Sequence, residues 1–343
     1  MSCTCFIIPQ DVLEKLSKDP ELSAELRKAS KNTALVNTEL RKLRDQALAL
    51  TSVTSAVGAH PIPLAPFPAV TVYDCKHHQT LPGSYVSNPE SSSDITASRT
   101  SKETTAVANF YKQIFSRNSI DGAGMTMVSS IHYGNNYNNA MWNGSQMIYG
   151  DGDNQIFIDF TAGNDVIGHE LTHGVTQHTL QLNYSNDAGG LNESLSDCFG
   201  TMFRQWQANQ DVNHADWLIG HDILGPVAKA KGYTCLRNMA NPADPHCIAP
   251  QPTKYSQITP GMDPHYSSGP PNLAFYLASK SVGGKSWEKV GQIWYRALTG
   301  FGPSPNMKMK EFANRTRKLA TQMYATVPAV ATAVGQAWKQ VGL

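Results

Sequence analysis

The chemistry that this sequence can perform is clearest in VIGHELTHGVTQH, residues 166–178, which contains a His-Glu-x-x-His pattern. His169 and His173 are four residues apart, so on a helix their imidazoles share one face. Two imidazoles one turn apart can bind one metal ion, and Glu170 then lies beside that ion, able to act on a bound water. A buried helix that happens to contain histidines would show the same pattern. A metal site therefore has to find further ligands elsewhere in the chain.

The next helical segment, GGLNESLSDCFGTMF at residues 189–203, supplies such ligands. Glu193 and Asp197 are four residues apart and lie on one face. With Glu193 as the third ligand, the fourth tetrahedral position is left for water, as in catalytic rather than structural zinc sites. Asp197 can accept the second ring N–H of a ligating histidine, which we expect to be His169, and so fix its tautomer.

The mixed set of two imidazoles and one carboxylate favours zinc over calcium, magnesium or a redox metal. The alternative is a charge cluster that faces solvent on two helices. That alternative is disfavoured because, without a metal, these polar faces would be costly to bury where two otherwise apolar helices meet.

The chain has 343 residues, which is long enough for two packed domains. Its composition, 41% hydrophobic and 16% charged residues, is typical of a soluble globular protein. A net charge of +1 gives no electrostatic footprint for nucleic acid or an anionic membrane, and no run approaches the roughly 18 apolar residues of a membrane span.

The start, MSCTCFIIPQ, lacks a basic region and a long apolar run, so we expect no Sec signal peptide. Secretion by a non-Sec route and a cytoplasmic location both stay open. We expect a monomer.

Hydrophobic periodicity divides the chain into four regions. Residues 1–50 contain two polar helices whose leucines recur near helical spacing, and residues 51–70 form a Pro-rich linker that is a target for maturation cleavage. In residues 71–164, short β-type runs (TVYDC, MTMVSSIHYG, SQMIYGDG and QIFIDF) flank one helix, KETTAVANFYKQIFSRN. Residues 165–343 are mainly helical. The predicted fold class is α+β, with an active-site cleft between the β-rich half and the helical half.

Four motifs together resemble the thermolysin-like neutral metallopeptidases: NNYNNAMWNGSQMIYGDGD, GHELTHGVT, GGLNESLSD and LRNMANPA. The similarity runs from about Val72 to the C-terminus. The helical N-terminal segment with IIP near its start is most similar to the protealysin subgroup, whose precursors carry a short pro-segment. The resemblance implies a thermolysin-like fold and a zinc-dependent endopeptidase that is made as a self-inhibited precursor.

By matching positions, the resemblance assigns roles to residues outside the metal cluster. Tyr184 and His265 match two hydrogen-bond donors to the oxyanion. Asn139 and the backbone of Ala140 match groups of an edge strand that hold the substrate backbone by strand addition. Arg237 matches the residue that binds a substrate carbonyl.

The reaction that the resemblance implies is peptide hydrolysis by a water that zinc acidifies, with Glu170 as the general base. The positions that match the first primed pocket of relatives are all apolar: Phe157, Val166, Ile219 and Leu236. We therefore expect cleavage on the N-terminal side of bulky hydrophobic residues, which then occupy the P1′ position.

The sequence departs from the family pattern at two places. Relatives orient the oxyanion histidine with an aspartate five residues earlier, whereas the nearest candidate here is Asp263, two residues before His265. Asp165 and Asp216 match carboxylates of a double calcium site. The other positions of that site hold residues that are not calcium ligands of this kind: Arg204, Leu218 and His221. Because a guanidinium repels calcium, we expect no double calcium site, and Arg204 can supply the positive charge instead.

The N-terminal region is long enough to fold over the active site and cover it. Our hypothesis is that residues 1 to about 60 fold over the catalytic half and block the cleft, so that the partners of the site are peptide substrates and the chain's own pro-segment. Cys3 or Cys5 could reach the zinc as a thiolate, or both could be ordinary thiols next to FIIP as a packing element. Cys235 and Cys247 could pair across a loop or remain free.

Two other functions remain as alternatives. An inactive relative could use the cleft as a zinc-stabilised peptide-binding module, although the presence of Glu170 and Tyr184 speaks against this. A zinc aminopeptidase would share the His-Glu-x-x-His pattern but needs an anionic recess for the free amine of its substrate. The segment NNAMWNGSQ contains no carboxylate that could form one.

Overall fold

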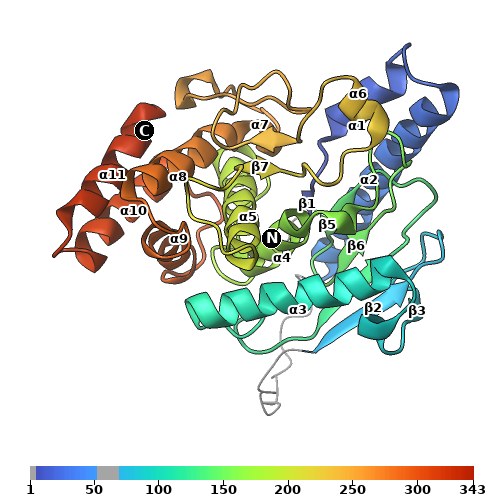
Figure 1. The fold of residues 1–343 in the computed structure, drawn as a ribbon, viewed down its shortest axis with the longest axis horizontal. Coiled ribbons are helices and arrows are strands. Elements are labelled where there is room, and N and C mark those ends of the chain that lie inside the picture. Colours follow the sequence, from blue (N-terminus) through green and yellow to red (C-terminus); the bar gives the residue numbers. More distant parts are fainter. Residues whose placement is uncertain (1–4, 52–68) are drawn as a thin grey trace.

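A six-stranded sheet forms the core of the N-terminal half of the molecule, of which the computed structural model describes residues 5–51 and 69–343 (Figure 1). The strand order is β1-β5-β6-β4-β2-β3, in which the β2–β4 and β4–β6 pairs are parallel and the remaining pairs are antiparallel. The strands are β1 (Cys5–Phe6), β2 (Val70–Asp74), β3 (Ser84–Tyr85), β4 (Met127–Ile131), β5 (Ala140–Trp142) and β6 (Met147–Tyr149). The predicted linker falls almost wholly outside the described residues.

Helices make up most of the C-terminal half, so the predicted α+β fold class is confirmed. They are α4 (Asn164–Gln177), α5 (Asn186–Gln207), α6 (Pro226–Ala230), α7 (Pro264–Ser267), α8 (Gly269–Val282), α9 (Lys289–Thr299), α10 (Met309–Met323) and α11 (Pro328–Gln340). A two-stranded ribbon pairs β7 (Leu218–Ile219) with β8 (Arg237–Asn238). Among the described residues, every helix is too short or too polar to span a membrane.

Helix α3 (Ile95–Phe115) begins before the predicted start at Lys102 because an N-cap lies upstream. The carboxylate of Asp94 accepts the backbone N–H groups of Thr96 and Ala97, at 2.9 and 3.3 Å, which satisfies donors that have no partner inside the helix. The same aspartate reappears below in a cluster of titratable side chains.

The run QIFIDF, which the sequence predicts as a strand, is not one: it contributes only an isolated bridge from Phe157 to Leu224. Asp153 gives the physical reason. Its Oδ1 accepts the backbone N–H groups of Gln155, Ile156 and Phe157, at 2.9, 2.7 and 3.3 Å. A side chain that binds successive amides holds a turn and competes with the sheet ladder.

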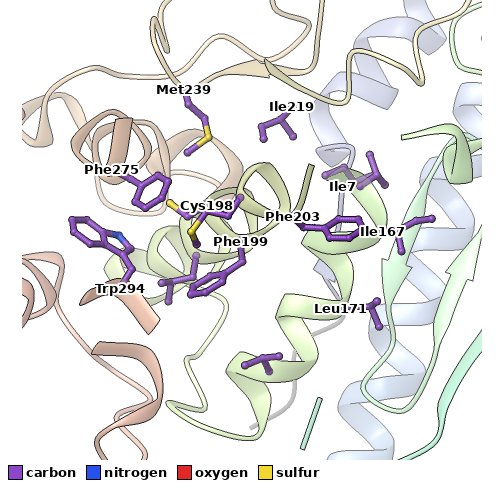
Figure 2. Close-up of a cluster of buried hydrophobic side chains, with 14 of the residues drawn as sticks. Ile7, Ile167, Leu171, Cys198, Phe199, Phe203, Ile219, Met239, Phe275 and Trp294 are labelled. Carbon is purple, nitrogen blue, oxygen red and sulfur yellow. The ribbon is translucent and has the colours of Figure 1, made fainter. Parts of the chain in front are cut away.

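The close crossing of α4 and α5 positions the candidate catalytic side chains. A Cβ atom on Gly200 would lie 2.6 Å from the carbonyl oxygen of Asp165 and 3.1 Å from the amide nitrogen of His169. A Cβ atom on Gly168 would lie 3.1 Å from the Cα of Gly200. The two helices therefore meet backbone to backbone, which only glycine allows here. Figure 2 shows buried apolar side chains around the crossing, including Ile167, Leu171, Phe199 and Phe203.

Two helices, α1 (Gln10–Lys18) and α2 (Ala24–Thr51), form the N-terminal region. The sequence predicts two helices here, at residues 11–30 and 33–50, but the break between them lies at residues 19–23 instead. The leucine spacing does not mark the buried face of α2, because the side chains of Leu35 and Leu43 are 58% and 61% exposed. The packed face is partly polar instead.

The contacts of α2 with the sheet domain include two buried hydrogen bonds. Thr33 Oγ1 accepts the backbone N–H of Asn138 at 3.0 Å, and Asn37 Oδ1 accepts the hydroxyl of Tyr137 at 2.6 Å. Because part of the packed face of α2 is polar, the spacing of apolar residues alone does not reveal it.

Substituting Gly200 by alanine tests the helix crossing. We expect Gly200→Ala to lower the free energy of unfolding by about 1–3 kcal/mol, because the added methyl overlaps the backbone of α4, and to lower metal content. Gly335→Ala is the matched control, since a Cβ atom on this glycine of α11 would have no atom within 4 Å. That change should raise stability by about 0.5–1 kcal/mol through helix propensity. Urea unfolding followed by circular dichroism measures both, and a Gly200→Ala protein as stable as the unmodified chain would contradict the close contact.

Candidate active site

His169 and His173 of α4 and Glu193 of α5 form one buried cluster. The Nε2 atoms of the two histidines lie 3.0 Å apart, and the carboxylate oxygens of Glu193 lie 3.5 Å from His169 Nε2 and 3.4 Å from His173 Nε2. Ligand atoms held at about 2.0–2.1 Å from a tetrahedral ion are separated by about 3.3 Å. The spacing therefore fits a single zinc-sized ion.

The far sides of the two rings determine which nitrogen carries the proton. His169 Nδ1 lies 2.8 Å from Asp197 Oδ1, and His173 Nδ1 lies 2.9 Å from Asn192 Oδ1. Both partners are acceptors, so both Nδ1 atoms donate and the lone pairs of the two Nε2 atoms face each other. Facing lone pairs repel unless a cation lies between them. Glu193 Oε2 is also buried with no hydrogen-bond partner among the described residues, so the donor set fits a zinc ion.

Asp197 carries the negative charge behind this cluster. Besides the bond to His169, its carboxylate accepts Nε and Nη2 of Arg237, at 2.9 and 2.7 Å, and Nδ2 of Asn272, at 2.8 Å. All four side chains are buried. Burial opposes the ionised form, but the Arg237 guanidinium and His169 outweigh it and keep the pKa of Asp197 well below its usual range. A charged, fully bonded carboxylate in this place orients the histidine that it contacts.

Glu170 is buried beside the cluster with one fixed and one free oxygen. Its Oε2 accepts the backbone N–H of Trp142 at 2.8 Å, and its Oε1 has no partner among the described residues. Burial, and then the nearby charge of Glu193, raise the pKa of Glu170 well above its ordinary value. A carboxylate whose pKa is raised holds a proton more readily than an exposed one does.

Tyr184 and His265 lie next to each other at the edge of the cluster. The Tyr184 hydroxyl donates to Glu193 and lies 3.3 Å from His265 Nε2. Asp263 Oδ1 lies 2.6 Å from His265 Nδ1, so the short spacing between these two residues still delivers a carboxylate to the ring. Burial lowers the pKa of His265, but the carboxylates of Glu193 and Asp263 outweigh burial and raise this pKa above its usual value. The phenol and the imidazole therefore lie side by side next to the metal cluster, and their role as donors to an oxyanion stays a prediction.

A segment of the chain's own N-terminal region lies across these residues as an additional strand. β1 pairs with β5 in antiparallel fashion, and the Ile7 N–H continues the pairing by donating to the carbonyl of Ala140 at 3.1 Å. Ile8 exchanges two hydrogen bonds with the side-chain amide of Asn139, at 3.0 and 3.2 Å. The edge of the sheet thus binds an extended peptide in the structure itself.

The same segment contacts the residues around the metal cluster. His265 Nε2 lies 2.5 Å from the carbonyl oxygen of Phe6, and Arg237 Nη1 donates to the carbonyl of Ile7 at 3.1 Å. The guanidinium of Arg41 on α2 lies 4.8 Å from the centre of the Phe6 ring. Arg237 therefore contacts a peptide carbonyl and Asp197 at once.

The apolar residues expected to line the first primed pocket are all buried and belong to one apolar cluster, which also contains Ile7. They are Phe157, Val166, Ile219 and Leu236. Figure 2 labels Ile7 and Ile219 within this cluster. Their role in selecting a substrate side chain stays a prediction.

Several supporting contacts were not predicted from the sequence. Asn192 and Ser196 both reach His173 Nδ1, the second at 3.0 Å. They are four residues apart on α5, so helical periodicity could have placed them together on one face. The bond from Asn272 to Asp197 joins residues 75 positions apart, and the N–H of Trp142 belongs to the backbone. Neither of these contacts leaves a signal in spacing or residue type.

The cysteine predictions have a mixed outcome. Cys5 is disulfide-bonded and does not belong to the group that could hold an ion, and Cys3 lies outside the described residues. Cys235 and Cys247 are buried, free thiols with their Sγ atoms 3.4 Å apart.

Arg204, at the end of α5, lies among three carboxylates. Its guanidinium is 3.6 Å from Asp165 Oδ1, 3.3 Å from Asp216 Oδ2 and 2.8 Å from Asp222 Oδ2. Burial lowers the pKa of Arg204, but the three aspartates outweigh burial and raise this pKa, so the side chain stays charged. Asp165 is fully buried, and its Oδ2 also accepts the backbone N–H of Gly220 at 2.6 Å.

A His-Glu-x-x-His helix, a glutamate from the following helix and a free carboxylate oxygen beside them define a zinc metallopeptidase. Residues 44–177 match the family model described as thermolysin metallopeptidase, catalytic domain, and residues 180–343 match the alpha-helical domain of the same family. The chain belongs to the thermolysin family of metallopeptidases. It is a metalloendopeptidase, and its membership implies zinc as the cofactor, which the cluster of His169, His173 and Glu193 fits.

Individual relatives agree with this assignment. The chain is 38% identical over 284 residues to an extracellular metalloprotease of Pectobacterium carotovorum subsp. carotovorum, a match that covers 80% of each chain. It is 36% identical over 288 residues to a thermolysin of Alicyclobacillus acidocaldarius subsp. acidocaldarius, covering 80% of this chain and 51% of that one. The solved precursor of protealysin, a metalloproteinase from Serratia proteamaculans, superimposes with a TM-score of 0.83 at 33% identity over 98% and 99% of the two chains. The predicted family resemblance and fold are confirmed.

Replacing Asp197 by asparagine tests its place behind the metal cluster. We expect Asp197→Asn to weaken zinc binding about 10- to 100-fold, because the neutral amide no longer raises the basicity of His169 and its NH2 group cannot accept the bonds that the lost carboxylate oxygen accepted. Asp187→Asn, on the same helix, is the control: Asp187 accepts the Met309 N–H at 3.0 Å and the Tyr255 hydroxyl at 3.1 Å, so its loss should affect stability rather than zinc. Competition with a chromogenic chelator measures both affinities, and equal zinc affinity in the two variants would contradict this role.

Proposed function

We propose that this chain is a zinc-dependent endopeptidase that prefers bulky hydrophobic P1′ residues and is kept inactive by its own N-terminal segment. One observation carries the proposal: residues 5–8 lie on the edge strand β5 in the way that a bound peptide would, and the groups that contact their backbone are those expected to hold a substrate. The match to the precursor of protealysin supports a pro-segment in this position.

Each side chain around the metal cluster has a different role in the proposed reaction. Zinc bound by His169, His173 and Glu193 supplies a Lewis acid and lowers the pKa of a water. Glu170, through its free Oε1, takes the proton of the attacking water and passes it to the leaving amine. Tyr184 and His265 then donate to the carbonyl oxygen that gains charge. In the structure the Phe6 carbonyl lies at His265, where the scissile carbonyl of a substrate would bind.

The substrate backbone is fixed by groups that do not react. Ala140 and Asn139 hold it as a strand, and Arg237 binds the carbonyl of the residue that follows the scissile bond. That residue is represented by Ile7, which is fully buried and belongs to the same apolar core as the side chains expected for the first primed pocket. We infer the P1′ preference from this position of Ile7.

The position of β1 favours an endopeptidase over an aminopeptidase. Cys5 pairs with Trp142 on the N-terminal side of Phe6, so the groove continues past the residue that represents P1. An aminopeptidase has to close its groove at that point in order to recognise a free amine. A peptide-binding module without turnover would use the same strand contacts, and only a kinetic assay separates it from an endopeptidase.

A doubly blocked peptide provides the decisive assay. With the chain trimmed to residues 69–343, we expect cleavage before a single internal leucine, no cleavage before aspartate in the same place, and no activity after chelation until zinc is restored. Glu170→Gln should lower kcat by about 100-fold or more through loss of the general base, with zinc content unchanged. Mass spectrometry of the products identifies the bond. Binding without turnover would support the module, and a need for a free amine would support the aminopeptidase.

Inhibition by the N-terminal segment predicts that a charge at Ile7 opens the cleft. We expect Ile7→Asp in the full chain to raise the initial rate on the blocked peptide, because a carboxylate cannot be buried unpaired in an apolar cluster. Ser23→Asp is the control, since it adds the same charge at an exposed site, where its Oγ already accepts the Leu26 N–H. Rates for both variants equal to that of the intact chain would refute inhibition by this segment.

We further infer that Arg204 replaces the double calcium site of thermolysin-like relatives. Millimolar calcium should then leave the Tm of the zinc-loaded protein unchanged. Arg204→Gln should destabilise the chain by about 3–5 kcal/mol, because the buried carboxylate of Asp165 loses its counter-charge. Differential scanning calorimetry with and without calcium tests both outcomes, and a calcium-dependent rise of Tm in the unmodified chain would refute the replacement.

A further inference from the structure

Three neighbouring strands of the sheet direct titratable side chains to the same edge. β6, β4 and β2 are parallel and adjacent, and a histidine or aspartate follows the carboxyl end of each: Asp151 after β6, His132 after β4 and His77 after β2. The carboxyl ends of parallel strands are where open α/β sheets bind ligands. This group of three side chains is separate from the catalytic cluster.

The ligand atoms of this group are close enough to share one ion. His132 Nδ1 lies 2.8 and 3.0 Å from the two oxygens of Asp151, and His77 Nδ1 lies 3.3 Å from Asp151 Oδ2. The two imidazole rings are 5.5 Å apart, centre to centre, and inclined by 54°. The His77–Asp151 separation equals the edge of a zinc tetrahedron, about 3.3 Å, and the His132–Asp151 pair needs only a few tenths of an ångström of adjustment.

A carboxylate behind His132 completes the arrangement. Asp94 Oδ2 lies 2.9 Å from His132 Nε2, the ring nitrogen that faces away from His77 and Asp151. The other oxygen of Asp94 is held by the backbone N–H groups at the start of α3. Histidines that bind metals almost always donate their second N–H to such a carboxylate, which fixes the tautomer that leaves the other nitrogen free.

The two histidine loops are held in an unusual backbone conformation. His77 and His132 have φ values of 60° and 51°, in the left-handed region that non-glycine residues adopt infrequently. A backbone hydrogen bond of 2.8 Å from the His77 N–H to the His132 carbonyl ties the loops together, and the Gly134 N–H reaches the His78 carbonyl at 3.1 Å. Strain of this kind concentrates at sites where side chains must be aimed.

We propose that His77, His132 and Asp151 form a second zinc site, which joins the carboxyl ends of β2, β4 and β6. Two imidazoles and one carboxylate suit zinc better than calcium or magnesium. The side chain of His77 is 59% exposed, whereas those of His132 and Asp151 are 19% and 22% exposed. The ion can therefore enter from the His77 side, and water completes its coordination there.

The competing interpretation is an ion-pair triad without metal, in which His132 is an imidazolium between Asp94 and Asp151. The two interpretations differ in what they require of His77. In the triad, His77 is an exposed neighbour that adds little, whereas in the zinc site it is one of three ligands. A variant of His77 therefore separates them and leaves the contacts of His132 intact.

The test is a zinc count on the full chain. We compare the unmodified protein with His77→Asn, which removes a ligand but keeps a residue that tolerates a left-handed backbone. His78→Asn is the matched control, because this adjacent histidine lies outside the cluster. Isothermal titration with zinc should show one tight and one weaker site in the unmodified chain and in His78→Asn. In His77→Asn the weaker site should lose affinity by about tenfold or more, while the tight site persists.

A second measurement identifies the ligands directly. Cobalt substituted at the weaker site of the zinc-loaded chain should give visible absorption bands of a low-symmetry four- or five-coordinate ion, and His77→Asn should remove these bands while His78→Asn keeps them. One zinc per unmodified chain, or a second zinc bound equally well by His77→Asn, would overturn the proposal in favour of the triad. Neither result depends on peptidase activity, so the test is independent of the proposed function.

Discussion

A buried ion pair between Asp197 and Arg237 is the interaction on which the active site depends. Two charges that leave water together lose several kcal/mol of solvation each, and only complete hydrogen bonding makes such burial tolerable. Here the carboxylate receives bonds from His169, Arg237 and Asn272, so that α4, α5, β8 and α8 are joined at one charge. The same guanidinium contacts the Ile7 carbonyl. The pair therefore contacts a histidine of the metal cluster on one side and the backbone of the N-terminal segment on the other, and one hydrogen-bonded network sets the separation between them.

The N-terminal region combines two kinds of contact that serve different ends. Ile7 and Ile8 are fully buried, whereas α2 contacts the sheet domain through apolar side chains, Val36 and Leu40, and through hydrogen bonds such as those of Thr33 and Asn37. Apolar contacts provide most of the free energy of association. If the segment leaves as we propose, the surface that it covered has to stay soluble and cannot be apolar throughout. A short apolar stretch next to the metal cluster and a contact on the sheet that mixes apolar and polar groups satisfy both requirements. Leu35 is exposed because Val36 and Leu40, together with polar side chains, form the face of α2 that contacts the sheet.

Sequence reasoning succeeds where one helix or one adjacent helix holds the chemistry. His169, His173, Glu193 and Asp197 are visible because a four-residue spacing forces pairs onto one face. It fails where geometry depends on side chains that bind backbone, as at Asp153, which converts an apparent strand into a turn. It also fails where distant loops converge. His77 is 55 positions from His132, which is 19 positions from Asp151, and only the parallel order of β2, β4 and β6 brings the three to one edge. Strand order is set by tertiary packing, which single-chain periodicity does not encode.

The start of α4 shows how charge can be compensated by a tethered group. Asp165 lies in the first turn of the helix that carries His169 and His173, and it is fully buried. An ion that neutralised it would dissociate when its concentration fell. Arg204 is part of the chain, and its guanidinium stays 3.6 Å from Asp165 Oδ1 whatever the surroundings contain, while the Gly220 N–H donates to the other oxygen. Because Gly200 brings α5 against α4 only a turn from Arg204, the residue that balances the charge and the residue that allows the close approach belong to one helix. The position of the catalytic histidines is therefore determined by packing and charge within the polypeptide.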